Sequence, residues 1–508
     1  MTAPNRALSW PLVLIPGLKL LLHALTFRGY GIFRDELYYV ACSQRLDLGY
    51  VDHPPLSIAL LAAWRGLFGE SLLAMRLAPA LAGALTVLLV GLITRQLGGR
   101  SFAQILAMTA AGTAPVMLAL HHYYSMNALD LLVWAAAGCW LLRRPQAGPR
   151  ATWLGLGVLC GLGLLNKISV LWLGAGLLVA ILATPLRRDL RQPWPWLGGA
   201  VAGAIFLPHV LWQIGHGWPT LEFIANATGE KMVRVAPLDF LLGQVEMMSF
   251  FIAPLWLGGL AWLLLSRRGK PFRSLGWIYL TVFVILAASG SSRPSYLAPA
   301  YGFLLAAGAV ALENLTSGRL GRWLRAGVAV IVVAAAALVA PFGMPLLAVD
   351  DYITHAQRLG VEPSTSERRE LAALPQFYAD MHGWQRIADA VVEVYRNLPE
   401  AERRQAAAFA PNYGVAGAIE VLGGDLGPPV ISGHNNYWLW GPGEASGEVV
   451  LVVGGERDEL AESYRSVELA AVVDCGHCLP SENQRPIFVA RGLRAPVDDV
   501  WRSVKHFD

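Results

Sequence analysis

Charged residues are scarce in this chain. Only 15% of the 508 residues are Asp, Glu, Lys or Arg, whereas 55% are hydrophobic, and the mean hydropathy is +0.46. A soluble protein could not bury that much apolar surface, so the composition excludes an ordinary soluble enzyme and predicts a polytopic α-helical membrane protein. The formal net charge of +4 is small and gives no indication of a nucleic-acid partner. No internal repeat or low-complexity tract is visible.

Cysteine is also scarce, since five cysteines are too few for a disulfide scaffold. Cys42, Cys139 and Cys160 stand alone, whereas Cys475 and Cys478 form a C-x-x-C motif in a polar region. No second cysteine pair accompanies this motif. The pattern therefore favours a disulfide or two free thiols over a redox-active or zinc site.

A cleavable signal peptide is not expected. The apolar stretch 8–27 is long, contains Lys19 and His23, and has no small-residue cleavage site before the polar loop that follows, so we interpret it as the first membrane span. Runs of roughly twenty apolar residues predict about eleven spans. These are expected at 8–27, 75–94, 101–120, 126–142, 151–165, 168–186, 194–214, 240–265, 274–290, 295–313 and 323–343.

Arginine marks every second loop between these spans. The arginine-rich loops lie near residues 95–100, 143–150, 187–191, 267–273 and 319–325, and Arg6 belongs to the same side. The positive-inside rule places this side in the cytoplasm, with the N-terminus. The first outer loop, predicted at 28–74, departs from the rule because it contains Arg34, Arg45 and Arg65. These arginines alternate with acidic residues in segments that we interpret as helices on the membrane surface.

The composition changes after Met344. Charges become dense, as in 367–370 and 402–404, and the apolar runs shorten. The pattern predicts strands at 406–410, 448–453 and 486–490 and helices at 380–397 and 458–470. Strands that alternate with helices indicate a small α/β domain of about 160 residues. We therefore expect two domains, a transmembrane domain at 1–344 and an extracytoplasmic α/β domain at 345–508.

The first outer loop contains an unusual group of polar residues. Asp35 and Glu36 lie where the chain leaves the bilayer, and Asp52 and His53 follow, ahead of two prolines. A carboxylate at a membrane rim is costly unless it is solvated, paired or used in function. The simpler alternative is the first turn of a surface helix, where acidic side chains suit the positive end of the helix dipole. The nearby histidine and prolines favour a functional loop.

The predicted topology brings polar residues from separate loops to one membrane face. These are Asp35, Glu36, Asp52, His53, His121, His122, Asn127, Asp130, Lys167, Lys231, Arg234 and Arg293. A carboxylate can take the proton from an attacking hydroxyl group. A lysine or arginine can neutralise a phosphate leaving group. The set thus suits a reaction between a nucleophile on the water side and a lipid-linked phosphate.

Each of these residues also has a structural alternative. Asp130 begins a helix, where its charge could compensate the helix dipole. Lys167 could mark a tight outer turn, and Arg293 could reach toward the lipid headgroups. His121 and His122 with Asp130 could bind a metal ion, but their spacing fits no zinc pattern.

Several of these residues belong to motifs that resemble a known family. Arg34, Asp35 and Glu36, followed by the segment 52–56 (Asp-His-Pro-Pro-Leu), resemble the first outer loop of the protein O-mannosyltransferases, glycosyltransferase family 39. The chain is similar, more distantly, to bacterial lipid A aminoarabinose and galacturonic acid transferases of the same GT-C superfamily. Segments 124–130, 164–167, 293–299 and 434–441 resemble further motifs of the bacterial branch.

This resemblance implies a polyprenyl-phosphate sugar donor, an inverting one-step transfer and no nucleotide sugar. Asp35 would be the base or would orient the acceptor, with Glu36 beside it, and Lys167 and Arg293 would hold the donor phosphate. The substrate-binding residues that it implies are Asp52, His53, Asn127, Asp130, Lys167, Arg293 and Tyr296. It implies no cofactor or metal, leaves a divalent cation open, and does not specify the sugar.

Three function classes follow from these observations. The leading hypothesis is a GT-C glycosyltransferase that uses an undecaprenyl-phosphate sugar at the outer face of a bacterial inner membrane, with a glycolipid, polysaccharide or protein as acceptor. The eukaryotic family members carry a lumenal module between spans, whereas the extra domain here is C-terminal, which favours an envelope glycolipid or polysaccharide.

The second hypothesis is a transporter or flippase of lipid-linked sugars. Such a protein should place ionisable groups near the middle of the bilayer on interrupted helices, often in repeated halves. Here only Lys19 and His23 lie well inside an apolar run. The third hypothesis is a structural membrane partner with an outer recognition domain, which leaves the clustered carboxylates and cations without a function.

Overall fold

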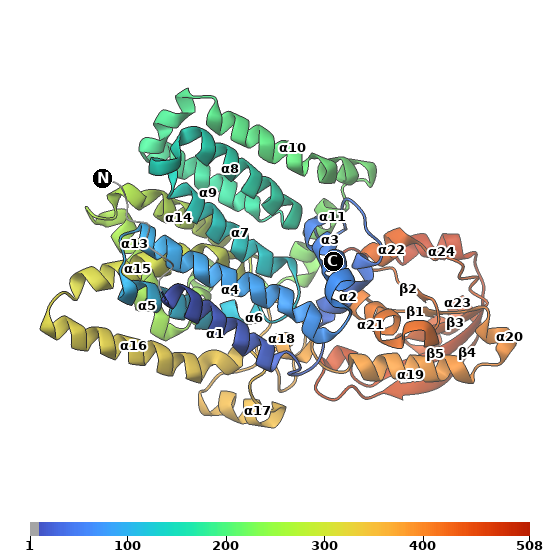
Figure 1. Cartoon of the computed structure of the whole chain (residues 1–508). Coiled ribbons are helices and arrows are strands. Elements are labelled where there is room, and N and C mark those ends of the chain that lie inside the picture. The colour runs from blue at the N-terminus through green and yellow to red at the C-terminus, as the bar shows by residue number, and fades with distance from the viewer. Residues whose placement is uncertain (1–9) are drawn as a thin grey trace. The chain divides into compact units, whose positions relative to one another are not determined.

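The computed structural model describes residues 10–508 and divides into two compact units (Figure 1). The first unit comprises the described residues of Met1–Gly29 together with Leu67–Leu211 and Arg234–Leu346. The second unit comprises Tyr30–Gly66, Trp212–Val233 and Leu347–Asp508. The first outer loop and a short central segment are therefore grouped with the C-terminal part of the chain. The division by membrane topology at residue 344 stays a prediction.

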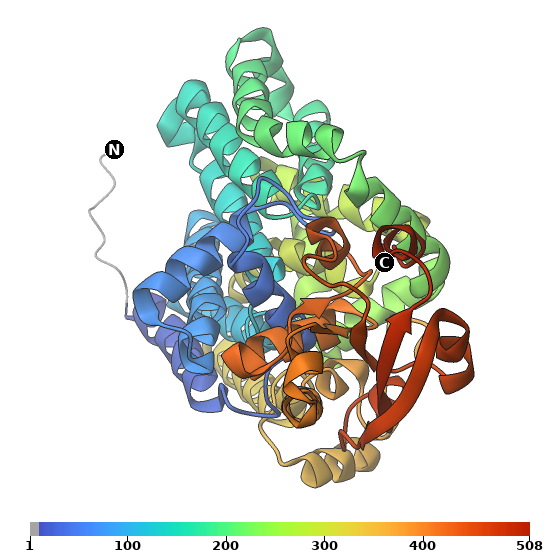
Figure 2. The same ribbon diagram turned by 90° about the vertical axis from the view of Figure 1, so that its right-hand side faces the viewer.

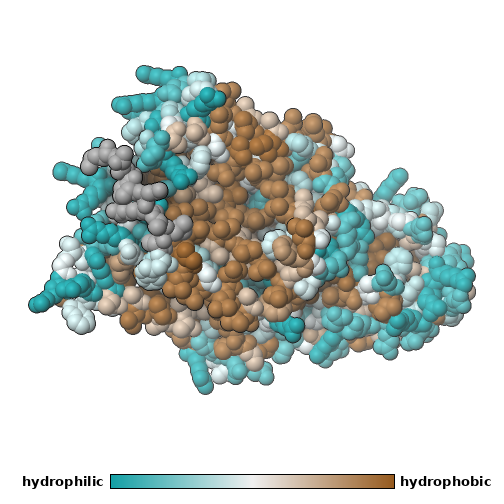
Figure 3. All heavy atoms as spheres, viewed as in Figure 1, coloured by the Kyte–Doolittle hydropathy of each residue, from teal (hydrophilic) through white to brown (hydrophobic). Residues whose placement is uncertain are grey.

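The first unit is a bundle of apolar helices. Its α-helices are α1 (Pro11–Thr26), α4 (Leu72–Gln96), α5 (Ser101–Thr113), α6 (Pro115–Ala119), α7 (Met126–Leu141), α8 (Arg144–Asn166), α9 (Val170–Ala183), α10 (Trp194–Gly215, whose last turn falls in the second unit), α12 (Pro237–Met248), α13 (Ala253–Leu265), α14 (Arg273–Ala288), α15 (Tyr301–Leu315) and α16 (Arg319–Val339). Short 3₁₀ helices are η1 (Pro185–Arg191), η3 (Phe250–Ile252), η4 (Lys270–Phe272), η5 (Pro294–Ala300) and η6 (Ala340–Phe342). Hydrophobic side chains gather on the surface of these helices (Figure 3).

Within residues 10–508, six helices are long and apolar enough to cross a membrane, or up to eight if each of two bent pairs counts as one span. The chain is therefore a multi-pass membrane protein, but the predicted number of about eleven spans is not confirmed. The predicted span 101–120 is divided into α5 and α6 because Pro115 cannot continue α5. The two bent pairs turn by 98° ahead of Pro185 and by 93° at Ser249, which has a φ of 77°. Arg6 and the first two residues of the predicted span 8–27 lie outside the described residues.

Helices α13 and α15 show how closely the first unit is packed. A Cβ atom at Gly259 would lie 2.0 Å from the carbonyl oxygen of Leu304, and one at Gly308 would lie 1.9 Å from that of Leu255. Only glycine fits at these two crossing points, which is typical of helix pairs in membranes. Helix α15 is accordingly almost fully buried between Tyr301 and Val310.

The second unit combines short helices with one sheet. Its helices are α2 (Arg34–Ser43), α3 (Leu56–Phe68), α11 (Pro219–Asn226), the π-helix η2 (Ala227–Lys231), α17 (Val349–Arg358), α18 (Gln376–Ala379), α19 (Trp384–Asn397), α20 (Glu400–Arg403), α21 (Tyr413–Gly423), η7 (Gly424–Leu426), α22 (Asn436–Trp440), α23 (Arg457–Ser463), η8 (Pro480–Glu482) and α24 (Val497–Ser503). Its strands are β1 (Ala406–Phe409), β2 (Val430–Ile431), β3 (Val449–Val453), β4 (Tyr464–Val473) and β5 (Arg485–Leu493).

The strands of the sheet lie in the C-terminal part of the chain, coloured orange to red in Figure 2. The sheet has five strands in the order β2-β1-β3-β5-β4. Strand β1 runs parallel to β2 and β3, whereas β5 runs antiparallel to β3 and β4. The predicted strands at 406–410, 448–453 and 486–490 and the predicted helix at 380–397 are found. The predicted helix at 458–470 is wrong beyond Ser463, because the following residues pair with β5 as strand β4. Long-range pairing here outweighs the local helical spacing.

Helix α2 packs on α21, and this contact joins the first outer loop to the C-terminal segment (Figure 1). A Cβ atom at Gly417 of α21 would lie 3.0 Å from the backbone of Leu37, and one at Gly414 would lie 2.6 Å from the side chain of Arg34. The two glycines thus allow α2 to approach α21 closely. The first turn of α2, which carries Asp35 and Glu36, lies at this contact.

Candidate functional site

The two adjacent carboxylates of α2 have different environments. Glu36 is fully buried, and its Oε2 accepts a hydrogen bond of 2.8 Å from the backbone N–H of Phe33, which caps the start of the helix. The side chain of Asp35 is 33% exposed. Capping gives Glu36 a structural role, and its catalytic role stays a prediction. Asp35 is the carboxylate of this pair that solvent, and therefore a substrate, can reach.

Arg34 is the centre of a buried charge cluster. Its Nη1 lies 3.5 Å from Asp380 Oδ1, its Nη2 lies 4.0 Å from Glu367 Oε1, and its Nε lies 3.7 Å from Asp35 Oδ1. Asp380 and Glu367 are each only 3% exposed. Burial raises the pKa of Asp380 to about 6, and the Arg34 guanidinium opposes this rise. Arg34 therefore compensates the buried Asp380, and it shares the compensation of Glu367 with Arg369, whose Nε lies 2.8 Å from Glu367 Oε2.

Tyr413 contacts Asp35 directly. Its hydroxyl group donates a hydrogen bond of 2.9 Å to Asp35 Oδ1. Tyr413 is the first residue of α21, whose N-terminus is capped by Asn412 through hydrogen bonds of 3.0 Å from the backbone N–H groups of Gly414 and Val415. Burial raises the pKa of Tyr413 well above its ordinary value, so this hydroxyl keeps its proton and acts as a donor.

Asp52 and His53 are fixed beside α2 by aromatic residues. The Tyr38 hydroxyl lies 3.0 Å from Asp52 Oδ1, and the ring of His53 stacks on Tyr39 at 4.8 Å between centroids. His53 is fully buried, and its Nε2 lies 3.8 Å from Asp52 Oδ1. Asn436 strengthens this arrangement, because its Oδ1 accepts a 2.7 Å hydrogen bond from the backbone N–H of the residue before Asp52. The segment 434–441 thus supports the first outer loop.

One group in the second unit could hold a metal ion. Candidate ligand atoms of His434, His506 and Asp508 lie within 4.8 Å of one another. Both ring nitrogens of His434 already have protein partners, since Nδ1 lies 3.4 Å from the backbone N–H of Tyr413 and Nε2 lies 2.9 Å from Asp508 O. Burial, together with the nearby His506, lowers the pKa of His434 well below its ordinary value, so the ring is neutral. Hydrogen bonding therefore accounts for the arrangement of His434.

The histidine pair singled out in the sequence lies elsewhere. His121 and His122 are buried in the first unit, and the structure does not group them with Asp130 as metal ligands within residues 10–508. The Nδ1 atom of His121 instead lies 2.6 Å from the carbonyl oxygen of Met117, one helical turn earlier. This local contact gives one ring nitrogen of His121 a hydrogen-bond partner.

Lys167 is the centre of a second polar cluster, in the first unit. Its Nζ donates a hydrogen bond of 2.7 Å to Asn127 Oδ1 and lies 3.7 Å from Asp130 Oδ2 and 5.2 Å from the centroid of the Tyr296 ring. Asp130 is 2% exposed and also accepts a hydrogen bond of 2.9 Å from Ser169 Oγ. Helix α8 ends just before Lys167, and α7 begins just before Asn127. Four of the predicted substrate-binding residues therefore meet here.

Arg293 lies close in sequence to Tyr296, one member of this cluster. It directly precedes η5, and its carbonyl oxygen accepts a 3.0 Å hydrogen bond from the backbone N–H of Tyr296. The ring of Tyr296 contacts Trp172 at 5.7 Å between centroids. The tight turn thus links the position of Arg293 to that of Tyr296.

The predicted site residues fall into two groups by unit. Asp35, Glu36, Asp52 and His53 belong to the second unit, and Asn127, Asp130, Lys167, Arg293 and Tyr296 belong to the first. The expectation that both groups line one hollow stays a prediction.

Three residues near Asp35 were missed by the sequence reasoning, namely Glu367, Asp380 and Tyr413. Glu367 lies in a stretch of dense charge that is typical of a solvated surface, and Asp380 lies in a polar stretch without a motif. The one available signal was for Tyr413, which follows a predicted strand and the capping residue Asn412. Residues after a strand often carry function.

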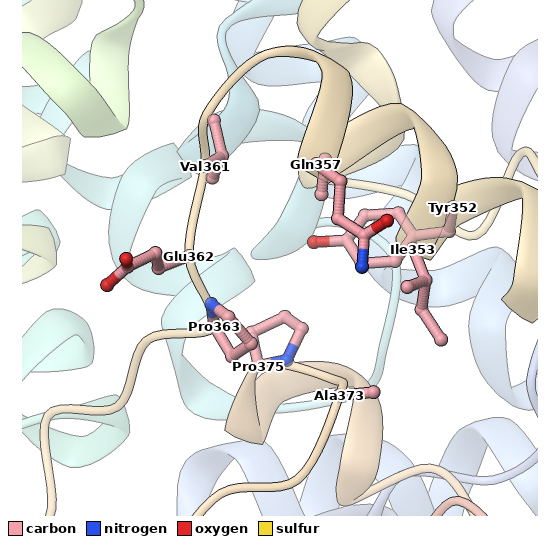
Figure 4. Close-up of a pocket in the computed structure, with 9 residues that line it drawn as sticks. Tyr352, Ile353, Gln357, Val361, Glu362, Pro363, Ala373 and Pro375 are labelled. Atoms are coloured by element: carbon pink, nitrogen blue, oxygen red, sulfur yellow. The ribbon is translucent and has the colours of Figure 1, made fainter.

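A pocket in the second unit lies apart from these groups in the sequence (Figure 4). It is formed by α17 and the segment 361–375, with Tyr352, Gln357, Glu362 and Pro375 among its lining residues. None of the predicted site residues is among the nine residues drawn around it.

The chain is similar to known membrane transferases. Residues 52–212 match the family described as dolichyl-phosphate-mannose-protein mannosyltransferase. An undecaprenyl phosphate-α-4-amino-4-deoxy-L-arabinose arabinosyl transferase of Pseudomonas fluorescens is 27% identical over an alignment of 328 residues that covers 57% of each chain. The lipid A galacturonosyltransferase RgtD of Rhizobium johnstonii is 25% identical over an alignment of 283 residues that covers 54% of this chain and 58% of RgtD. The chain thus spans a little more than half the length of these curated relatives.

The fold is similar to that of a solved structure over almost the whole chain. The structure is ArnT from Cupriavidus metallidurans bound to undecaprenyl phosphate, with a TM-score of 0.64, 16% identity and coverage of 95% of this chain and 98% of ArnT. The predicted fold class, a helical membrane bundle with a small sheet-containing C-terminal part, is confirmed apart from the number of spans. The predicted resemblance is confirmed as well.

Proposed function

We propose that this chain is a membrane glycosyltransferase of the GT-C superfamily and transfers a sugar from undecaprenyl phosphate to lipid A. The observation that carries the proposal is the similarity, over more than half of the chain, to a transferase named for its undecaprenyl phosphate-linked sugar. The name of RgtD supports lipid A as the acceptor. The reaction takes place at the outer face of a bacterial inner membrane, with the N-terminus in the cytoplasm and residues 345–508 in the periplasm.

Asp35 is the base in the proposed reaction. The oxygen of an acceptor hydroxyl group forms a bond to the anomeric carbon of the sugar, while the bond between that carbon and the phosphate oxygen breaks. The hydroxyl proton passes to the Asp35 carboxylate, and undecaprenyl phosphate leaves with the electron pair of the broken bond. A single displacement of this kind inverts the anomeric configuration. The partial exposure of Asp35 supports this role.

Lys167 and Arg293 bind the phosphate of the donor in this proposal. A fixed cation lowers the barrier when it stabilises the negative charge that develops on a leaving group. Asn127 and Asp130 contact Lys167 and limit its freedom, so the cation needs little reorganisation before the reaction. Tyr296 contacts the same ammonium group, whereas Asp52 and His53 shape the loop that follows α2.

The donor class can be tested in washed inner membranes that contain the full-length protein and come from a host without lipid A glycosyltransferases of its own. The membranes receive lipid A and a sugar linked either to undecaprenyl phosphate or to a nucleotide, with 4-amino-4-deoxy-L-arabinose and galacturonic acid as the sugars. We expect one of the lipid-linked donors, and neither nucleotide donor, to add a sugar increment to lipid A in mass spectra. Transfer from a nucleotide donor, or none from either lipid-linked donor, would contradict the proposal.

A further inference from the structure

The proposed base and its hydrogen-bond donor are far apart in the sequence. Asp35 lies in the first outer loop, and Tyr413 lies 378 residues later at the start of α21. Both residues belong to the second unit, so their contact lies within one compact part of the molecule. The C-terminal segment thereby contributes a side chain that touches Asp35.

The ring of Tyr413 is held from several sides. The Arg34 guanidinium lies 5.4 Å from its centroid, and the rings of Tyr38 and His434 each lie 4.8 Å away. Tyr413 is 8% exposed. Since these neighbours come from both α2 and the segment before α22, the hydroxyl group has little freedom to turn away from Asp35.

The contacts also distinguish the two oxygens of the carboxylate. Tyr413 donates to Oδ1, and the Nε atom of Arg34 approaches the same oxygen at 3.7 Å. The Tyr413 hydrogen bond therefore fixes the carboxylate through Oδ1, and the positive charge of Arg34 favours the same orientation. In this orientation Oδ2 is the oxygen that takes the proton from the acceptor hydroxyl.

We propose that Tyr413 is a positioning residue for the glycosyl transfer and holds Asp35 so that Oδ2 faces the acceptor. This inference rests on the proposed function, because it assumes that Asp35 is the base. It also assigns the C-terminal segment a direct part in the chemical step, in addition to any part in acceptor selection. A carboxylate held in one orientation reacts faster than one that samples several, and hydrogen bonds to a carboxylate favour its charged form.

The substitution Tyr413→Phe tests this role because it removes only the hydroxyl group and keeps the packed ring. The matched control is Tyr437→Phe, since the buried Tyr437 donates a hydrogen bond of 2.7 Å to Glu420, which has no part in the proposed chemistry. We expect Tyr413→Phe to lower kcat about 10- to 100-fold, the usual range for a hydrogen bond to a charged group, with little change in KM. The acid limb of its pH–activity profile should move to higher pH, because the carboxylate holds its proton more readily. Neither effect is expected for Tyr437→Phe.

A second substitution tests the same role even if the Tyr413→Phe variant does not fold. Site-specific replacement of Tyr413 by 3-fluorotyrosine keeps the hydroxyl group and makes it a stronger donor. We expect this variant to stay active and its acid limb to move to lower pH, opposite to the shift in Tyr413→Phe. A purely structural role would leave the acid limb in place in both variants.

The outcomes separate this inference from the proposed function. The inference is overturned if Tyr413→Phe behaves like Tyr437→Phe in kcat and if the fluorotyrosine variant leaves the acid limb unchanged, while Asp35→Asn is inactive. If Asp35→Asn retains full activity, the assignment of the base itself fails, whatever the tyrosine variants do.

Discussion

Asp35 and Lys167, the proposed base and the proposed phosphate-binding cation, lie in two clusters that are built in different ways. Lys167 in the first unit contacts Asn127, only 40 residues earlier, across the adjoining helices α7 and α8. Asp35 in the second unit contacts Tyr413, 378 residues later, and its neighbour Arg34 reaches Asp380 and Glu367 in the same distant segment. The hydrogen bond and the ion pair of the cation therefore come from a neighbouring helix, with Tyr296 as a more distant contact, whereas the hydrogen bond to the Asp35 carboxylate comes from a remote segment.

The two clusters also differ in charge balance. Around Lys167 the structure places one ammonium group beside one carboxylate, Asp130, at 3.7 Å. Around Arg34 it places three carboxylates within 4.0 Å, and one of them, Glu367, also pairs with Arg369 at 2.8 Å. The difference indicates that loss of Arg34 affects more carboxylates than loss of Lys167 does.

The largest expected effect on stability comes from Arg34→Met, which removes the guanidinium group. The buried Asp380 then loses its ion pair, whereas Glu367 keeps its ion pair with Arg369 at 2.8 Å. Loss of one member of a buried ion pair typically costs about 3–5 kcal/mol. We expect a decrease of this size in the free energy of unfolding of the detergent-solubilised full chain, measured by chemical denaturation. The control is Arg45→Met, because Arg45 is more exposed, with 40% of its side chain accessible, and pairs with Glu420. That change should cost about 1 kcal/mol or less. Equal losses for the two variants would show that the Asp35 cluster does not depend on Arg34.

A smaller effect, on activity, is expected from Lys167→Met. Loss of a charged contact to the donor phosphate should reduce kcat/KM for the undecaprenyl phosphate-linked donor about 100-fold. Lys167→Arg keeps the charge and should recover part of this loss. The control is Lys270→Met, which changes an exposed lysine in η4. If Lys167→Met keeps the wild-type kcat/KM, Lys167 does not bind the donor phosphate.

The smallest effect concerns the pH dependence of stability. Because burial raises the pKa of Asp380 to about 6, the folded chain holds this proton where the unfolded chain has lost it. The contribution of Asp380 to stability is therefore present at lower pH and is lost as the pH rises through about 6. Between about pH 5 and about pH 7 the wild type should lose about 1 kcal/mol more stability than Asp380→Asn. Asp389→Asn, a change at an exposed carboxylate of α19, should show no such difference from the wild type. A difference in the free energy of unfolding between wild type and Asp380→Asn that does not change with pH would contradict the raised pKa of Asp380.

The contrast between contacts made by neighbouring elements and contacts made by remote segments explains how much of the molecule could be predicted from its sequence. Asn127, Asp130 and Lys167 were identified because each follows or begins an apolar run, where a single polar residue is conspicuous. The bundle and three of the five strands were also predictable, since hydrophobic periodicity depends on nearby residues. Strand β4 was missed because its first residues continue a helical spacing, and only pairing with β5 decides their conformation.

The partners of Asp35 could not be predicted for a related reason. Glu367, Asp380 and Tyr413 lie in polar surroundings, where one more charge or hydroxyl group carries no signal. Tyr413 reaches Asp35 because α2 packs on α21, and two glycines of α21 permit that contact. Glu367 and Asp380 lie outside α21 and pair with Arg34 beside Asp35. Contacts of this kind depend on the tertiary fold and not on a local pattern.

Asp35 takes the proton of the acceptor in the proposed reaction, and the substitution Asp35→Asn tests this role most directly. Lipid A glycosylation would be followed by mass spectrometry in washed membranes with the lipid-linked donor, beside Asp47→Asn, which changes an exposed carboxylate outside the motif in the same loop. Loss of a general base typically reduces the rate about 100- to 10,000-fold, so we expect a loss in this range for Asp35→Asn, with normal folding, and wild-type activity for Asp47→Asn. A correctly folded Asp35→Asn protein that transfers sugar at the wild-type rate would contradict the mechanism.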